Sequence, residues 1–79
     1  MRYAIVIEKA DNNYSAYVPD VPGCIATGAT ADEVKQRLAD ALEFHLEGMR
    51  ADGETPPVPT SAVDYVEVLG APTTKRAAG

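Results

Sequence analysis

The single histidine and the single cysteine are the side chains best suited to acid–base or nucleophilic chemistry. His45 could act as a pH-sensitive or interface residue, because imidazole titrates near neutral pH. No serine, cysteine or carboxylate lies at a local spacing that would complete a nucleophilic triad with it. We therefore expect a neutral, packed imidazole satisfied by one hydrogen bond. Cys24 has no second cysteine for a disulfide or a zinc site, so we expect a small packing residue.

Acidic side chains are the other chemically distinctive group. Twelve Asp and Glu residues against seven Lys and Arg give a net charge of −5. Phosphate contacts need clustered basic residues, so this charge argues against direct nucleic acid binding and favours a basic protein partner. Asp40, Glu43 and Glu47 fall on one face of a predicted helix and could steer such a partner. The alternative is an ordinary solvated helix face.

A rigid turn and a helix cap determine where these side chains lie. Residues 17–24 end one strand with two prolines and a glycine, and Gly23 can take the positive φ that reverses the chain. The Thr30 hydroxyl is predicted to accept from the Glu33 amide, while the Glu33 carboxylate accepts from the Thr30 amide. This capping box predicts the start of the helix.

The remaining elements follow from hydrophobic periodicity. Strands are expected over residues 2–8, 14–18, 24–27 and 63–69, and a helix over residues 31–50. Asp52 and Gly53 should end the helix, and the prolines of residues 56–59 should form a stiff connector. The predicted sheet-facing stripe of the helix comprises Val34, Leu38, Ala41, Leu42, His45 and Met49, and the wet face comprises Gln36, Asp40, Glu43, Glu47 and Arg50. Glu33 and Arg37 are spaced for an ion pair.

These elements predict an α+β domain in which one helix packs on one face of a four-stranded sheet. A right-handed crossover would place the fourth strand beside and parallel to the first, which gives the β-β-β-α-β order 3-2-1-4. The helix covers only one face, so Ala4, Val6 and Tyr17 are left on the other. Homodimerisation would bury them, although small apolar side chains are also ordinarily exposed.

Four groups of residues together resemble the HicB family, the antitoxins of HicA–HicB toxin–antitoxin systems. They are the turn at residues 17–24, the Gly28-x-Thr30-x-x-Glu33 helix entry, the helix positions Leu42, Leu46 and Glu47, and the exit over residues 53–59. Two positions depart from the family pattern, Ala29 and Val34. The resemblance implies a partial ribonuclease H-like fold, which agrees with the predicted strand order.

The resemblance also implies a function. It indicates an antitoxin-type module that neutralises a basic, HicA-like, mRNA-cleaving toxin by direct binding, with no enzymatic activity, cofactor or metal. The residues predicted to bind the partner are Tyr17, Asp20, Asp40, Glu43 and Glu47. An orphan interaction module that has lost its toxin is an alternative.

A metal-dependent nuclease is the third interpretation, because the ribonuclease H likeness directs attention to Glu8, Glu43 and Asp64. Such cleavage needs converging carboxylates that hold two ions about 4 Å apart. Glu43 points away from the sheet on the helical wheel, so we do not expect an enzyme.

Length and composition indicate the organisation of the chain. Residues 1–69 are predicted to form the HicB-like domain and residues 70–79 a flexible C-terminal tail, too short for the DNA-binding domain that many family members carry. A domain of this size buries only about 60% of its unfolded surface, so a homodimer or tetramer is expected. The sequence shows no signal peptide and no apolar run of about 20 residues, so a cytoplasmic location is expected.

Overall fold

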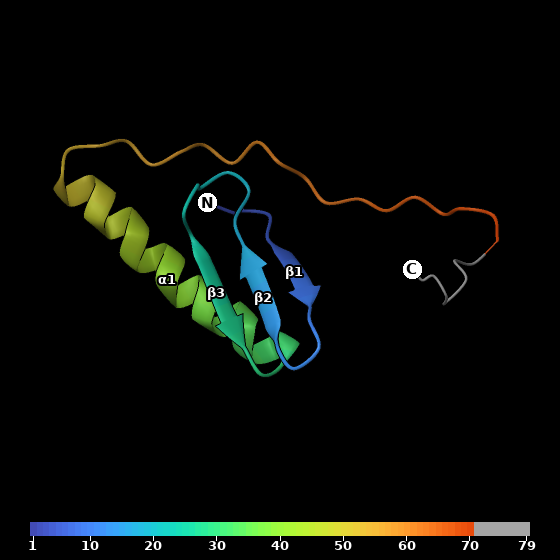
Figure 1. The fold of residues 1–79 in the computed structure, drawn as a ribbon. Coiled ribbons are helices and arrows are strands. Elements are labelled where there is room, and N and C mark those ends of the chain that lie inside the picture. The colour runs from blue at the N-terminus through green and yellow to red at the C-terminus, as the bar shows by residue number, and fades with distance from the viewer. Residues whose placement is uncertain (71–79) are drawn as a thin grey trace.

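Three short antiparallel strands and one long helix form the folded part of the chain (Figure 1). The computed structural model describes residues 1–70. The elements are β1 (Val6–Lys9), β2 (Tyr14–Tyr17), β3 (Ile25–Gly28) and α1 (Ala31–Ala51). The sheet has the order β1-β2-β3. The α+β class, the hairpin and the order of these three strands are therefore confirmed.

The turn between β2 and β3 is held by its own backbone. The Val18 amide donates to the Cys24 carbonyl at 3.2 Å, and the Cys24 amide donates to the Val21 carbonyl at 3.2 Å. Gly23 has φ +87°, the positive value predicted for it. Val18, Val21 and Cys24 are all buried, so this turn is an inward-packed part of the core.

The start of α1 is capped by side chains, as the sequence predicts, with one difference. Thr30 Oγ1 accepts from the Glu33 amide at 3.0 Å, which confirms the cap. Glu33 Oε1 accepts from the Ala29 amide at 2.7 Å, one residue before the predicted donor, Thr30. The other carboxylate oxygen forms the predicted ion pair with Arg37 at 2.8 Å, and Arg37 also donates to the Thr27 carbonyl at 3.2 Å. Glu33 therefore serves both the cap and a bridge from α1 to β3.

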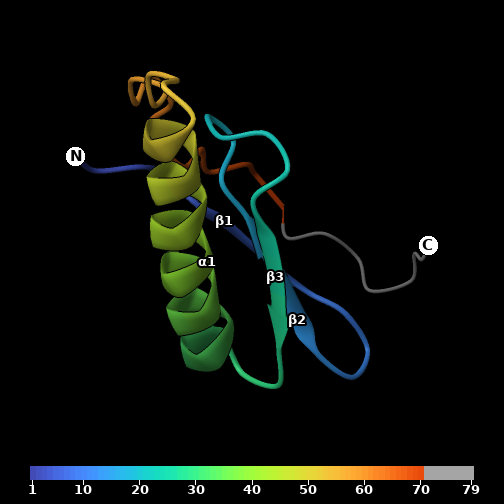
Figure 2. The same ribbon diagram turned by 90° about the vertical axis from the view of Figure 1, so that its left-hand side faces the viewer.

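The core lies between α1 and one face of the sheet (Figure 2). Val34, Leu38 and Leu46 are the buried residues of the helix; Val34 and Leu38 pack in one cluster with Ala16 and Val18. The predicted stripe is largely confirmed, but Leu46 is buried while His45 and Met49 are only half-buried at its margin.

The opposite face of the sheet is bare in Figure 2. Pairing in register places Val6 opposite Tyr17, and Tyr17 opposite Ile25. Cross-strand partners project from the same face, so these three side chains form a row on the uncovered side. Tyr17 is 41% exposed and Ile25 is 63% exposed. The expected positions of Val6 and Tyr17 on this face are confirmed, and Ile25 joins them.

The first strand, β1, begins later than predicted. Its pairing with β2 starts at Val6, whereas the sequence predicted a strand from residue 2. The same register would place Ala4 opposite Pro19, which has no N–H to donate to the Ala4 carbonyl. The residues before Val6 therefore cannot continue the hydrogen-bonded pairing of β1 with β2.

The predicted fourth strand, residues 63–69, does not join the sheet of its own chain. After α1 the connector crosses the β2–β3 turn, passes residues 2–4 and runs away from the sheet (Figure 1). Tyr3 donates its hydroxyl to the Pro57 carbonyl, and Asp20 holds Thr60 and Ser61. These contacts end at residue 61, and residues 61–70 are all exposed. Most of the predicted tail, residues 71–79, lies outside the described residues.

Candidate partner-binding surfaces

The outer face of α1 carries an acidic stripe with an aromatic side chain at its margin. Asp40, Glu43, Phe44 and Glu47 are all exposed and have the spacing i, i+3, i+4 and i+7, so they share one side of the helix. Phe44 is 79% exposed. We call these four residues the acidic helix face.

The carboxylates of the acidic helix face form few ion pairs or hydrogen bonds with other described residues. Within residues 1–70 the one ion pair joins Glu33 to Arg37, so Asp40, Glu43 and Glu47 have no cationic partner within 4.0 Å. Gln36 donates to Asp40 at 3.1 Å. Glu43 and Glu47 also line a groove of about 310 Å³ shared with the N-terminal residues Met1 and Tyr3. The negative charge of this face is therefore available to a partner.

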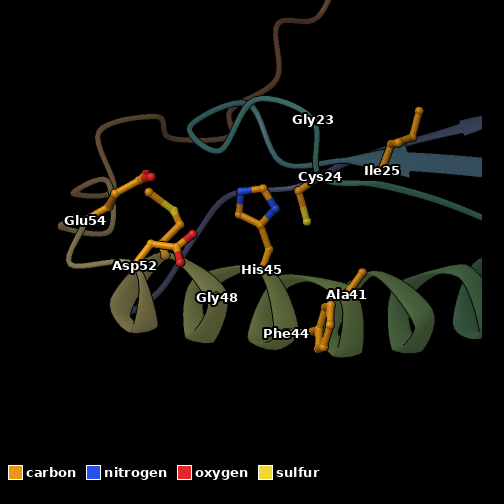
Figure 3. A pocket seen from close by; sticks show the side chains of 10 residues that line it. Gly23, Cys24, Ile25, Ala41, Phe44, His45, Gly48, Asp52 and Glu54 are labelled. Carbon is orange, nitrogen blue, oxygen red and sulfur yellow. The ribbon is translucent and has the colours of Figure 1, made fainter.

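A second groove, of about 470 Å³, lies between α1 and the β2–β3 turn (Figure 3). His45 rises from the helix into it, with Cys24 on one side and Asp52 and Glu54 on the other. The imidazole is half-buried and makes no hydrogen bond to another described residue, which differs from the hydrogen-bonded core histidine that was predicted. Cys24 is buried as predicted, and this burial raises the pKa of its thiol.

Asp20 has an internal role. Its two carboxylate oxygens accept four hydrogen bonds of 2.8 to 3.1 Å, from the amides and the hydroxyls of Thr60 and Ser61. The bonds from Ser61 and then from Thr60 lower the pKa of Asp20 to about 2. We call this arrangement the Asp20 clamp, because it fixes the connector onto the β2–β3 turn.

The five predicted partner-binding residues thus lie in three separate places. Asp40, Glu43 and Glu47 are together on α1, whereas Tyr17 is on the uncovered sheet face, which is the opposite side of the domain (Figure 2). Asp20 is in the turn. The sequence reasoning missed Phe44, whose signal was its place between carboxylates at helical spacing.

The three carboxylates of the nuclease interpretation do not come together either. Glu8 is on β1, Glu43 on the outer side of α1 and Asp64 on the exposed segment beyond the Asp20 clamp. In the part of the chain that the structure describes, no group of three or more His, Cys, Asp or Glu side chains could hold a metal ion.

Comparison with known proteins identifies relatives. A family model described as the HicB-like antitoxin of bacterial toxin–antitoxin systems matches residues 3–70. An uncharacterised 14.9 kDa protein of Haemophilus phage HP1 is 41% identical over 66 residues, which cover 84% of this chain and 50% of the phage protein. A UPF0150 protein of Archaeoglobus fulgidus is 42% identical over 57 residues, covering 68% of this chain and 83% of that protein.

The fold has a solved relative. A crystal structure of a protein from Thermus thermophilus superposes with a TM-score of 0.63 at 40% identity, covering 67% of this chain and 68% of that one. The chain spans only half the length of the phage relative. Among residues 1–70, no helix has the length and apolar character needed to cross a membrane.

Proposed function

This chain belongs to the HicB-like antitoxin family of bacterial toxin–antitoxin systems, and we propose that it neutralises a basic, HicA-like, mRNA-cleaving toxin by direct binding. In this proposal the protein covers the toxin surface in the cytoplasm and performs no chemistry of its own. The family match supports a toxin–antitoxin role, and the surface of the domain supports the mode of binding.

The acidic helix face is the observation that carries the proposal. Its three carboxylates lack cationic partners within the described residues, so they are available to attract a basic protein and to raise the association rate. Charge alone gives little affinity, but Phe44 adds a large exposed apolar side chain beside the carboxylates. Burying a phenylalanine contributes about 1.5–3 kcal/mol, and aromatic anchors dominate many interfaces. The proposed toxin-binding surface is therefore Asp40, Glu43, Phe44 and Glu47.

Tyr17 and Asp20 stand apart from this proposed surface. Tyr17 projects from the opposite side of the sheet, and the Asp20 carboxylate is already satisfied by four hydrogen bonds. A toxin large enough to contact both sides would have to wrap around the domain. We therefore assign first contact with the toxin to α1.

The test first looks for an adjacent short reading frame that encodes a basic, HicA-like protein, and then measures binding to that protein. The double variant Glu43→Lys/Glu47→Lys should slow association by tenfold or more at low salt, and added salt should reduce the difference. The matched control Glu8→Lys/Asp11→Lys makes the same change in net charge at exposed positions of the hairpin. Phe44→Ala should mainly speed dissociation. Equal effects of the two charge reversals would place the interface elsewhere.

Two results would replace the proposal. A chain that binds no basic toxin, and does not relieve the growth arrest that the neighbouring toxin causes, would be an orphan interaction module. RNA cleavage with Mg²⁺ or Mn²⁺ that is abolished by Glu8→Gln and Asp64→Asn would establish a nuclease.

A further inference from the structure

Residues 62–69 form an extended segment that has the sequence of a strand but pairs with no strand of its own chain, although Ala62 and Val63 lie near residues 2–4. We call this segment the arm. Its apolar side chains are among the most exposed of the described residues: Val63 56%, Tyr65 88%, Val66 90%, Val68 74% and Leu69 102%. So much apolar surface on one short segment is typical of an interaction site.

The edge of the sheet is complementary to the arm. β1 is an edge strand, so one side of its backbone has no strand partner. Next to the start of β1, between the N-terminal segment that leads into it and α1, an open groove of about 350 Å³ is lined by apolar side chains that include Tyr3, Ile5, Leu38 and Leu42. We call it the edge groove. An uncovered edge strand beside an apolar groove is the arrangement that accepts an added strand.

We propose that the arm of one copy pairs with β1 and fills the edge groove of a second copy of this chain, and that the second arm does the same in return. Fully extended, the eight residues of the arm span about 26 Å, which is enough to run the length of β1 and its N-terminal extension. Each arm would supply the fourth strand that the sequence pattern predicts, in the sheet of the partner copy.

The Asp20 clamp is one reason for choosing a second copy over the arm's own sheet. It fixes Thr60 and Ser61 onto the β2–β3 turn, and the chain then passes residues 2–4 and continues away from β1 (Figure 1). The clamp therefore holds the base of the arm in place while the arm itself leaves the domain. A strand held in this way is presented to another molecule.

Charge and symmetry give the second reason. The arm carries two acids, Asp64 and Glu67, whereas the N-terminal segment and α1 place Arg2 and Lys35 along the edge groove. Opposite charges on the arm and the groove favour this pairing over contact with a toxin through the arm. Every copy carries both an arm and a groove, so a two-fold exchange satisfies all of them and closes the assembly at a dimer.

The test places a nitroxide on the arm of the full chain and reads its position by paramagnetic broadening. The Glu67→Cys variant, prepared with ¹⁴N, carries the nitroxide. It is mixed with ¹⁵N wild type, which is the copy observed by NMR. If the arms are exchanged between copies, the nitroxide should broaden the β1 amides, Val6 to Lys9, of the ¹⁵N wild-type copy. In the reverse mixture, the chain that carries the nitroxide is also the ¹⁵N chain, and it is diluted in excess ¹⁴N wild type. The β1 amides of that same chain should then stay sharp. Wild type treated with the same reagent is the labelling control, because Cys24 is buried.

A matched pair of proline variants tests the pairing itself. Val66→Pro removes an amide donor in the middle of the arm and should weaken the dimer roughly tenfold or more, because a symmetric dimer loses the contact twice. Val58→Pro makes the same substitution at an exposed position of the proline-rich connector and should leave the dimer intact. Sedimentation should give twice the 8.4 kDa chain mass for wild type and for this control.

Several outcomes would overturn the exchange. Broadening of β1 only within the labelled chain would mean that the arm folds back on its own sheet. Broadening that appears only when toxin is added would assign the arm to the toxin. A monomeric wild type at NMR concentration, or a dimer that Val66→Pro leaves unchanged, would also refute it. None of these readouts depends on toxin binding through α1.

Discussion

Replacing Gly28 by alanine should destabilise the domain, although alanine is the more favourable residue in most strands. Gly28 ends β3 where it meets the first turn of α1. An added Cβ would lie 2.8 Å from the Val34 amide nitrogen and 3.0 Å from its Cα. These atoms cannot yield easily, because Val34 is fully buried and its amide donates to the Thr30 carbonyl at 2.9 Å.

The expected magnitude follows from these distances. Overpacking in a core costs about 1–3 kcal/mol. The smaller entropy of the unfolded alanine chain offsets about 0.4–1 kcal/mol of that cost. The two terms bracket a fall of about 0–2.6 kcal/mol in the free energy of unfolding. The 2.8 Å contact with buried backbone favours the upper part of that range, about 1–2 kcal/mol, a large share of the roughly 5 kcal/mol typical of small domains. With a urea m-value near 1 kcal/mol/M, the midpoint should fall by about 1–2 M.

Gly48→Ala is the matched control for this experiment. Gly48 is inside α1, and a Cβ added there would meet nothing within 4 Å. This variant should gain about 0.5–1 kcal/mol, because glycine is unfavourable within a helix. Both variants and wild type are unfolded in urea at one chain concentration, since self-association changes apparent stability. If Gly28→Ala were as stable as wild type or Gly48→Ala, the close approach of β3 to α1 would be refuted.

The other predictions concern the cap, the clamp and the thiol. Thr30→Ala should lower the free energy of unfolding by about 0.5–2 kcal/mol in the same urea assay, and no loss would mean that the cap is not needed. The folded pKa of Asp20, about 2, lies below its ordinary value of 3.8, so the clamp should stabilise the connector fully above about pH 4 and fail as the pH falls toward 2. The Thr60 and Ser61 amide shifts should titrate near pH 2, and a midpoint near 3.8 would contradict the clamp. Cys24 should react slowly with a thiol reagent at about pH 8 and rapidly in urea, whereas fast native labelling would show that its turn is open.

The parts of the fold that the sequence predicts correctly are those set by neighbouring residues. The turn depends on Pro19, Pro22 and Gly23, and the helix start depends on Thr30 and Glu33, which lie three residues apart. Such features depend on the torsions and hydrogen bonds of neighbouring residues, so the sequence predicts them without knowledge of distant contacts. The register of the hairpin then follows, because a slip of one residue would move Ala16 out of the core.

The prediction of the fourth strand failed for a different physical reason. A strand needs a partner, and the alternation of residues 63–69 is the same whether that partner is in the same chain or another one. The sequence pattern could not predict the Asp20 clamp either, because Asp20 lies 40 residues from Thr60 and 41 from Ser61. Periodicity carries no information about contacts at that separation.

The candidate site was predicted in part. The exposed positions of Asp40, Glu43 and Glu47 follow directly from the 3.6-residue period of the helix. Phe44 was missed because the search for apolar residues followed the stripe that faces the sheet. An aromatic residue four positions after Asp40 and three before Glu47 lies outside the sheet-facing stripe, so the helical period gave it no role in the core.

The arm and the acidic helix face are separate surfaces, so each proposal can fail without the other. The arm continues from the connector and leaves the domain (Figure 1), whereas the acidic helix face consists of exposed residues of α1. A monomeric Val66→Pro variant should therefore still bind one toxin through its intact acidic face. A wild-type dimer would present two such faces, and binding to a surface that carries many toxin molecules would gain avidity without any new contact. If the monomeric variant no longer bound one toxin molecule, the toxin would contact the arm or the dimer interface, and α1 would not be the binding site.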